Sequence, residues 1–240
     1  MPILRETVTV EPYGDSAVMV SIPAPDAAAR RCEIVAFRSR LLARRPHGVV
    51  DVVSGLESLL VSFDPLVTSF EHVEYAARLL AELPDSGTGA AQPARRFAIP
   101  VLFDAEAAPD LDEVAGELGL TADEAIERIC RSQFSISLLA AAMAPMMDGL
   151  DTPRPVRRRA EPRTDVPAGS IMIAGVNAII QPFPGPTGWR VVGRTPHTIV
   201  DIHRERPVSF DPGDLVRFTR IDRAGAARLD GAFLTEEGVS

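Results

Sequence analysis

The sequence contains no lysine, so all 25 of its basic residues are arginines, set against 33 acidic residues. The absence of lysine excludes a lysine nucleophile and a Schiff base. Cysteine is almost as scarce, and Cys32 and Cys130 fit neither a metal-ligand spacing nor a disulfide framework. This cysteine usage favours a reducing compartment, and we expect a cytoplasmic protein.

The chain also lacks long apolar runs. No terminal segment has the form of a signal peptide, and none reaches the length of a membrane span. The net charge is −8 and the arginines are spread along the chain, which does not favour a nucleic-acid partner. We therefore expect a soluble protein without a membrane or nucleic-acid partner.

Several catalytic motifs are missing as well. There is no G-x-S-x-G nucleophile elbow and no phosphate-binding P-loop, so nucleophilic hydrolysis or nucleotide binding by this chain alone has no support. We expect no cofactor bound by the chain. No metal site is expected either. The four histidines are dispersed, and no cysteine or carboxylate lies near them at the spacing of metal ligands; they are His47, His72, His197 and His203.

What is present begins with an alternating pattern. Apolar residues alternate as in strands in residues 7–22 and then recur at helical spacing in 26–45. The same order repeats, with strand-like alternation in 49–64 and helical spacing in 69–83. This order predicts a small α/β sandwich whose helices cover one face of a sheet. The sequence PDSGTGAAQP at 84–93 is a good linker, and we place the domains at 1–88 and 89–240.

The pattern in the second half of the chain predicts a larger domain that is mainly β, so the whole protein is expected to be of the α+β class. A strand at 97–103 precedes helices at 110–118 and 121–131, the second one started by a capping box between Thr121 and Glu124. Strands and turns alone are expected from Ser170 onward, and the last twenty residues are weakly patterned. This predicts a closed or sandwiched β domain with one helical insertion, and the expected strands are 170–174, 178–182, 189–192, 198–202 and 215–221.

Residues 162–196 are the stretch that the rest of the chain is expected to present. They combine glycine, proline and the only tryptophan with polar side chains suited to a small amide, carboxylate or phosphate. The alternative is a hairpin region whose glycines and prolines only turn corners and whose tryptophan fills the core. The candidate substrate-binding residues are Arg163, Ser170, Asn177, Gln181, Trp189, Arg190, Arg194 and Thr195.

Two loops precede this stretch. Residues 140–147 (AAAMAPMM) carry no charge and form either a buried loop wall or a partner-facing surface. Residues 151–163 are basic and interrupted by proline, so they are either a solvated loop or an arginine-rich flap over an anionic ligand. Asp148 and Asp151 are the candidates for a catalytic base or orienting group, and solvated loop carboxylates are the alternative.

Taken together, several separated strings resemble the allophanate hydrolase subunit 1 family. This family is also known as the B subunit of 5-oxoprolinase or the Kip-type kinase-inhibitor family, and it corresponds to subdomains C and D of the carboxyltransferase domain of urea carboxylase. The strings run in the family's order across nearly the whole chain, and they are YGDSA at 13–17, DVVSGLESLLVSFDP at 51–65, IPV at 99–101, PDL and EVA at 109–115, VPAGSIMIAG at 166–175 and GWRVVGRTP at 188–196.

The resemblance implies a cyclophilin-like β-barrel in the C-terminal domain and a partner of the subunit 2 type, which is the C-type subunit of 5-oxoprolinase. It also implies an assembly, with a third subunit in the bacterial 5-oxoprolinase case, that acts on a small amide or lactam. In 5-oxoprolinase the assembled complex uses ATP to open 5-oxoproline to glutamate, and in urea carboxylase the equivalent domain carboxylates urea. The Kip-type members imply the alternative of a non-catalytic module that regulates a histidine kinase, and a purely structural subunit is a third possibility.

This chain departs from the family's pattern at positions that bear on catalysis. Ile129 stands where the family has a histidine, which removes the usual group for proton transfer near neutral pH. The GFxPGFxYLGGL-like segment is replaced by alanine and methionine in LAAAMAPMMDGL at 139–150. We therefore expect a divergent member, with either another substrate or lapsed chemistry.

Overall fold

The computed structural model describes residues 8–82 and 94–236. The chain divides into two compact units, Met1–Pro93 and Ala94–Ser240. The predicted boundary between residues 88 and 89 lies outside the described residues. None of the described helices combines the length and the apolar character needed to cross a membrane.

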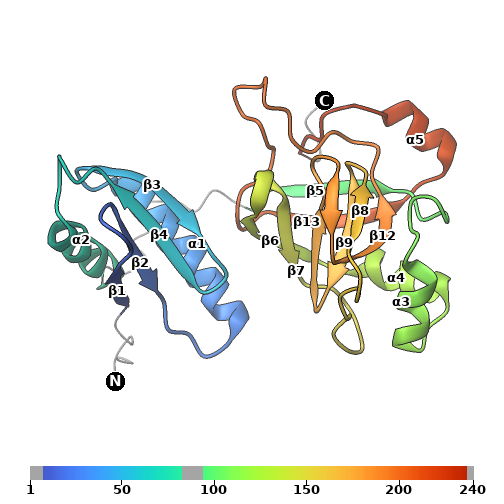
Figure 1. Ribbon diagram of the computed structural model, residues 1–240, viewed down its shortest axis with the longest axis horizontal. Helices are drawn as coiled ribbons and strands as arrows, with labels where there is room; N and C mark the ends of the chain where they lie inside the picture. Colours follow the sequence, from blue (N-terminus) through green and yellow to red (C-terminus); the bar gives the residue numbers. More distant parts are fainter. Residues whose placement is uncertain (1–7, 83–93, 237–240) are drawn as a thin grey trace. The chain divides into compact units, whose positions relative to one another are not determined.

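The first unit is a four-stranded antiparallel sheet in the order β1-β2-β4-β3, with two helices on one face (Figure 1). Helix α1 packs on β3 and β4, helix α2 packs on β1 and β2, and the helices contact each other. The predicted α/β sandwich is confirmed. Its elements are β1 (Thr9–Pro12), β2 (Ala17–Ser21), α1 (Ala27–Arg44), β3 (Val49–Ser54), β4 (Ser58–Phe63) and α2 (Phe70–Glu82).

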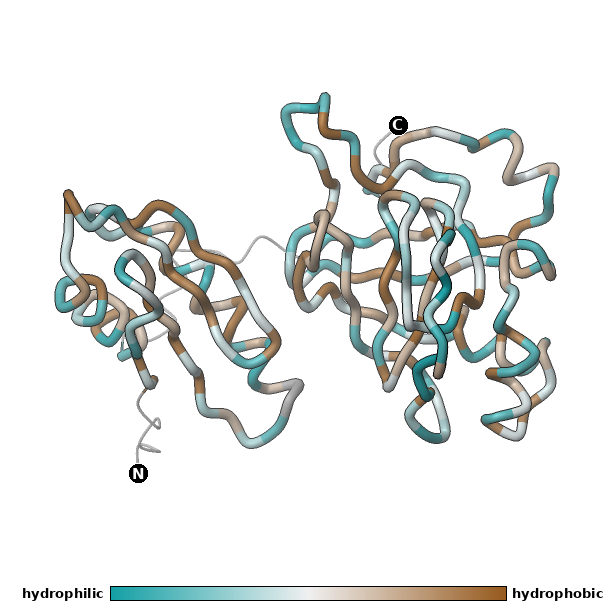
Figure 2. The backbone as a smooth tube through the Cα atoms, viewed as in Figure 1, coloured by the Kyte–Doolittle hydropathy of each residue, from teal (hydrophilic) through white to brown (hydrophobic). Residues whose placement is uncertain are grey.

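Alternation along the strands explains the core of this unit. Val18 and Val20 on β2 and Leu59 and Val61 on β4 are fully buried, because successive strand residues point to opposite faces and these point towards the helices. Figure 2 shows hydrophobic segments along these strands. The side chain of Asp26 accepts a hydrogen bond from the N–H of Ala29 at 2.8 Å, which caps α1 where the sequence predicted its start.

The second unit is a seven-stranded sheet in the order β12-β9-β10-β7-β6-β13-β5, with a separate ribbon of β8 and β11. Helices α3 and α4 pack against β12 and β13 respectively. The elements are β5 (Arg96–Val101), α3 (Leu111–Leu118), α4 (Ala122–Arg131), β6 (Phe134–Leu139), η1 (Ala141–Met143), β7 (Pro145–Asp148), β8 (Arg163–Val166), β9 (Ser170–Ala174), β10 (Asn177–Ile180), β11 (Gly185–Thr187), β12 (Arg190–Arg194), β13 (Leu215–Arg220) and α5 (Arg223–Leu229).

The two edges of this sheet meet and nearly close it into a barrel. Leu102, directly after β5, exchanges two backbone hydrogen bonds of 2.8 and 3.0 Å with Arg194 at the end of β12. Gly193 lies at the closure, where an added Cβ would stand 2.6 Å from Cγ1 of Val101 and 3.1 Å from the carbonyl oxygen of Leu102. The absence of a side chain at residue 193 therefore lets the edges approach, and the predicted closed β domain is confirmed.

Some elements differ from the sequence-based expectation. Residues 198–202 were expected to form a strand, but Thr198 and Val200 make only isolated bridges. The prediction that only strands and turns follow Ser170 was wrong, because α5 forms there with the Asp222 side chain accepting from the N–H of Gly225 at 2.7 Å. This helix buries only Gly225 and Ala226, so it leaves no strong apolar periodicity in the sequence.

The closure of the barrel predicts an asymmetric response to adding one methyl group. Gly193→Ala should destabilise the protein by about 1–3 kcal/mol, because the new Cβ clashes with a stiff buried valine and with backbone. Gly188→Ala is the matched control, since nothing lies within 4 Å of its added Cβ, and its stability should change by less than about 0.5 kcal/mol. Urea unfolding of both variants measures this, and equal stabilities would contradict the closure argument.

Candidate functional site

A pocket of about 310 Å³ opens on the outer face of the barrel in the second unit. Met172 of β9 and Ile179 of β10 form its floor, and Thr187 and Trp189 stand at one side. It is lined by Ala140, Ala141, Ala142, Ala144, Met172, Ile179, Gln181, Pro182, Phe183, Pro184, Pro186, Thr187 and Trp189. Pockets of this size suit a small molecule.

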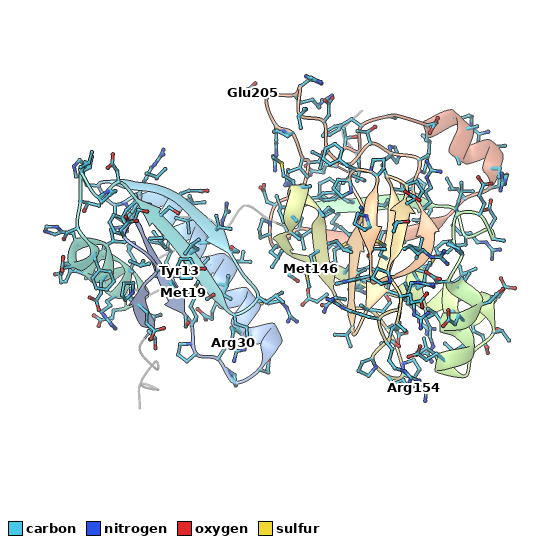
Figure 3. All side chains as sticks on the ribbon, viewed as in Figure 1. Tyr13, Met19, Arg30, Met146, Arg154 and Glu205 are labelled. Atoms are coloured by element: carbon cyan, nitrogen blue, oxygen red, sulfur yellow. The ribbon has the colours of Figure 1, made fainter. Side chains whose placement is uncertain are left out.

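The floor follows from strand register. On β9 and β10 the inward residues belong to the main core cluster, while Met172 and Ile179 are directly opposite each other on the outer face. Ile179 also lies opposite Met146 of β7, a residue labelled in Figure 3. Met172 packs with Val166 of β8 and with Val191, and Trp189 packs against the same cluster. The pocket is thus built on a second, smaller apolar cluster outside the barrel.

Three lining side chains carry polar groups: the amide of Gln181, the hydroxyl of Thr187 and the indole N–H of Trp189. The Thr187 hydroxyl accepts a hydrogen bond of 3.0 Å from the backbone N–H of Trp189. Among the described residues, no hydrogen-bond partner is found for the side-chain amide of Gln181. An amide carries both donors and an acceptor and matches another amide or a lactam. None of the lining residues titrates near neutral pH, so the pocket can bind such a group but cannot itself move its protons.

The pocket is also lined by an alanine loop with unusual backbone. Ala142 and Met143 have φ of 56° and 61°, the left-handed region that L-residues other than glycine rarely adopt. Such a conformation costs about 1–2 kcal/mol per residue, and conformations of this kind cluster at binding sites. Met143, between the lining residues Ala142 and Ala144, is 40% exposed. Ala140, Ala141, Ala142 and Ala144 line the pocket. Ala141 and Ala142 are exposed, so they do not form the buried wall that was one of the two expectations for 140–147, whereas Met147 belongs to the barrel core.

Beside the pocket, a buried carboxylate organises the basic loop. Asp110, 1% exposed, accepts hydrogen bonds from Arg159, from Arg163 at 2.6 and 3.2 Å, and from the backbone N–H of Val191 at 2.9 Å. Burial by itself raises the pKa of this carboxyl. The hydrogen bonds from Arg163 and Val191 and the charges of Arg163 and Arg159 outweigh burial and leave the pKa below its ordinary value.

A charged hollow of about 760 Å³ lies between α3 and the basic loop, and it is lined by Glu113, Glu117, Arg157, Arg158, Arg159, Ala160, Glu161 and Arg190. Arg190, with a side chain only 9% exposed, pairs with Glu113 at 2.6 Å, and Arg157 pairs with Glu117 at 3.1 Å. Arg190 also donates to the backbone carbonyl of Arg157 at 3.1 Å. The loop 151–163 is therefore fastened to α3 by ion pairs, and the predicted ligand groups Arg163 and Arg190 are occupied by protein carboxylates.

The structure brings only two of the predicted substrate-binding residues, Gln181 and Trp189, into the pocket. Ser170 and Thr195 are buried, and the Thr195 hydroxyl accepts from the N–H of His197 at 3.3 Å. Arg194 is exposed and donates to the carbonyl of Ala168 at 3.2 Å. These three residues hold the ends of β9 and β12.

The two predicted acids have different surroundings. Asp151 pairs with Arg128 and Arg131 at 2.9 and 2.8 Å, and the hydrogen bond from Arg131, with both charges, lowers its pKa although burial opposes the shift. Asp148 accepts from the Ser137 hydroxyl at 2.9 Å and lies opposite Asn177 on the outer face. Asn177 is two residues from Ile179 on β10, so this polar pair lies beside the pocket floor but does not line it.

Ile129 is 3% exposed and belongs to the main core cluster, so that position of α4 faces the interior. In the described part of the chain, no three His, Cys, Asp or Glu side chains gather as metal ligands. Sequence reasoning missed the acids of α3. The sequence did contain a signal for them. Asp110, Glu113 and Glu117 are spaced three and four residues apart, which places them on one helix face, and arginines of the loop 151–163 pair with them.

With this geometry in view, comparison with known proteins identifies the class. The sequence matches the family described as "Carboxyltransferase domain, subdomain C and D" over residues 8–210. It is 31% identical over 212 residues to the B subunit of 5-oxoprolinase from Haemophilus influenzae, covering 88% of this chain and 97% of the relative. The chain belongs to the carboxyltransferase subdomain C and D family.

Solved structures agree with this assignment. The crystal structure of TTHA0988 superposes with a TM-score of 0.72 at 29% identity, covering 86% of this chain and 40% of that chain. This chain therefore spans about two fifths of that protein. The Kluyveromyces lactis urea carboxylase superposes with a TM-score of 0.70 at 18% identity over 96% of this chain and 23% of that chain, which shows a shared fold.

The buried carboxylate predicts a pH-dependent loss of stability. Asp110→Asn should destabilise the protein by about 1–3 kcal/mol at pH 7, because it removes the negative charge that pairs with the partly exposed Arg159 and Arg163. The folded-state pKa of Asp110 is lowered, so its contribution is present above the unfolded value of about 3.9 and is lost as pH falls through the folded-state pKa.

Urea unfolding at pH 7 and at about pH 3.5 tests this, and the gap between wild type and Asp110→Asn should narrow at the acid pH. Asp165→Asn, at an exposed carboxylate on β8, is the control and should change stability by less than about 0.5 kcal/mol. A gap that widens on acidification would refute the assignment of the stabilising charge to Asp110.

Proposed function

We propose that this chain is the substrate-holding subunit of a heteromeric 5-oxoprolinase-like enzyme, in which the assembled complex uses ATP to open the lactam of 5-oxoproline to glutamate. The relative that supports this is named as the B subunit of 5-oxoprolinase and is matched over nearly its whole length. The observation that carries the proposal is the small apolar pocket in which the unpartnered amide of Gln181 lies with Thr187 and Trp189.

The lining of the pocket assigns a limited role to this chain. A lactam presents one N–H and one carbonyl oxygen, which the Gln181 amide can match. Opening a lactam also requires proton transfer and activation of the carbonyl group, and the pocket offers no titratable side chain for either. These groups are therefore assigned to a partner protein of the subunit 2 type.

ATP is assigned to the assembled complex. The chain has no P-loop and no lysine to hold phosphates, and the pocket is near the lower limit for ligand sites, too small for a nucleotide together with a lactam. A third subunit, as in the 5-oxoprolinase assembly, completes the proposal. The chain spans 40% of TTHA0988, so a relative exists in which this region is part of a longer polypeptide.

The direct test is reconstitution. The chain is co-expressed with the partner of the subunit 2 type and the third subunit, and glutamate release from 5-oxoproline is measured with and without ATP. A complex in which the Haemophilus influenzae relative replaces this chain is the positive control. If that control turns over while the complex with this chain does not, the enzymatic proposal fails and the kinase-regulating alternative gains support.

A second test addresses the pocket. Gln181→Leu keeps side-chain size but removes the amide, and it should lower kcat/KM of the reconstituted complex by about 10-fold to 100-fold, the effect of removing a hydrogen-bonding group from a lactam in an apolar site. Gln133→Leu is the matched control, because Gln133 is exposed and outside the pocket. Equal activity of the two variants would remove Gln181 from the site.

A further inference from the structure

One arginine beside the pocket differs from its neighbours. Arg157, Arg159, Arg163 and Arg190 each pair with a carboxylate of α3 or of its N-terminal Asp110. Arg158 lies in the middle of the same loop, and within the described residues it has no carboxylate at ion-pair distance. Its recorded contact is with the face of Trp189, whose ring centre lies 5.6 Å from the guanidinium carbon.

This contact places an unneutralised charge next to the pocket. Arg158 lines the charged hollow together with Glu113 and Glu117, and the indole ring that it contacts belongs to Trp189, which lines the pocket. A cation–π contact at an exposed site is weaker than a bidentate pair between arginine and a carboxylate. The side chain of Arg158 is exposed, so its guanidinium can exchange the ring for a carboxylate held at the pocket mouth.

The position of Arg158 is fixed by the residues around it. Arg159 is bound to buried Asp110, and the backbone N–H of Arg159 donates to the carbonyl of Gly188 at 2.9 Å. Arg157 is tied to Glu117 and, through its carbonyl, to Arg190. The backbone on both sides of Arg158 is therefore held against the segment that carries Trp189, while its side chain keeps its freedom.

We propose that Arg158 is a specificity-determining residue that selects ligands in which a small lactam or amide carries a carboxylate. Gln181 holds the amide part, the apolar floor holds the carbon skeleton, and Arg158 pairs with the carboxylate through its planar fork. This proposal rests on the proposed function and assigns the recognition of the substrate's carboxylate to Arg158.

The experiment compares two lactams that differ only in the carboxylate, L-5-oxoproline and 2-pyrrolidinone. Their dissociation constants are measured for the full chain and for the assembled complex by isothermal titration or ligand-observed NMR. The wild type should bind L-5-oxoproline about 10-fold or more tightly than 2-pyrrolidinone, the ratio expected for one hydrogen-bonded charge pair. Arg158→Gln should remove this preference by weakening L-5-oxoproline alone.

Two further variants make the result specific. Arg158→Lys keeps the charge but lacks the fork, so it should restore part of the preference. Arg154→Gln is the matched control, because Arg154 is an exposed arginine near the outer end of the same loop (Figure 3), and it should behave as wild type. An unchanged preference in Arg158→Gln overturns the proposal, as does a wild type that binds neither lactam or binds both equally.

Turnover measured in parallel separates this proposal from the function on which it rests. A complex that turns over 5-oxoproline while Arg158→Gln keeps the wild-type preference overturns the role of Arg158 alone. A complex without turnover, in which the preference exists and depends on Arg158, overturns the enzymatic function alone. Unchanged urea unfolding of Arg158→Gln verifies that the exposed substitution leaves the fold intact.

Discussion

The buried carboxylate of Asp110 is the interaction on which the candidate site depends. It joins four pieces of chain: the start of α3, β12 through Val191, the basic loop through Arg159, and β8 through Arg163. The backbone of Asp110 also donates to the carbonyl of Val191 at 3.0 Å. Isolated charges are costly to bury, but here both carboxylate oxygens have partners. The indole of Trp189, two residues before Val191, is held in place by this junction.

The pocket next to this junction owes its shape to stiff backbone. Pro182, Pro184 and Pro186 in its lining have fixed φ angles, and Ala142 and Met143 in the alanine loop hold a left-handed conformation. The alanines contribute little bulk, so the hollow between loop and ribbon stays open instead of being filled by side chains. A cavity preformed in this way loses little conformational entropy when a small ligand binds.

Local signals made the α/β unit and most of the barrel predictable from the sequence. The Asp26 cap, the capping box at Thr121 and the alternation on β2 and β4 act between close neighbours. The candidate site was predictable only in part. Asp110 lies 49, 53 and 81 residues from the three groups that bind it, and no local pattern records such pairings. Arg163 and Arg190 carry the residue type suited to an anionic ligand, but the acids of α3 occupy them.

The ion pairs around α3 also explain why a positive charge remains near the pocket although the chain as a whole is acidic. Arg157, Arg159 and Arg190 each pair with a carboxylate of Glu117, Asp110 or Glu113. This cluster of side chains therefore contains many charged groups, but their charges largely cancel. Arg158 lines the same hollow as Glu113 and Glu117, but among the described residues it makes no ion pair, and its guanidinium group lies over the ring of Trp189. A charge beside a wall of low polarity is less screened than one in open water. Among the described residues of this cluster, Arg158 is thus the arginine without an ion pair. Its guanidinium group lies over the indole of Trp189, which lines the pocket.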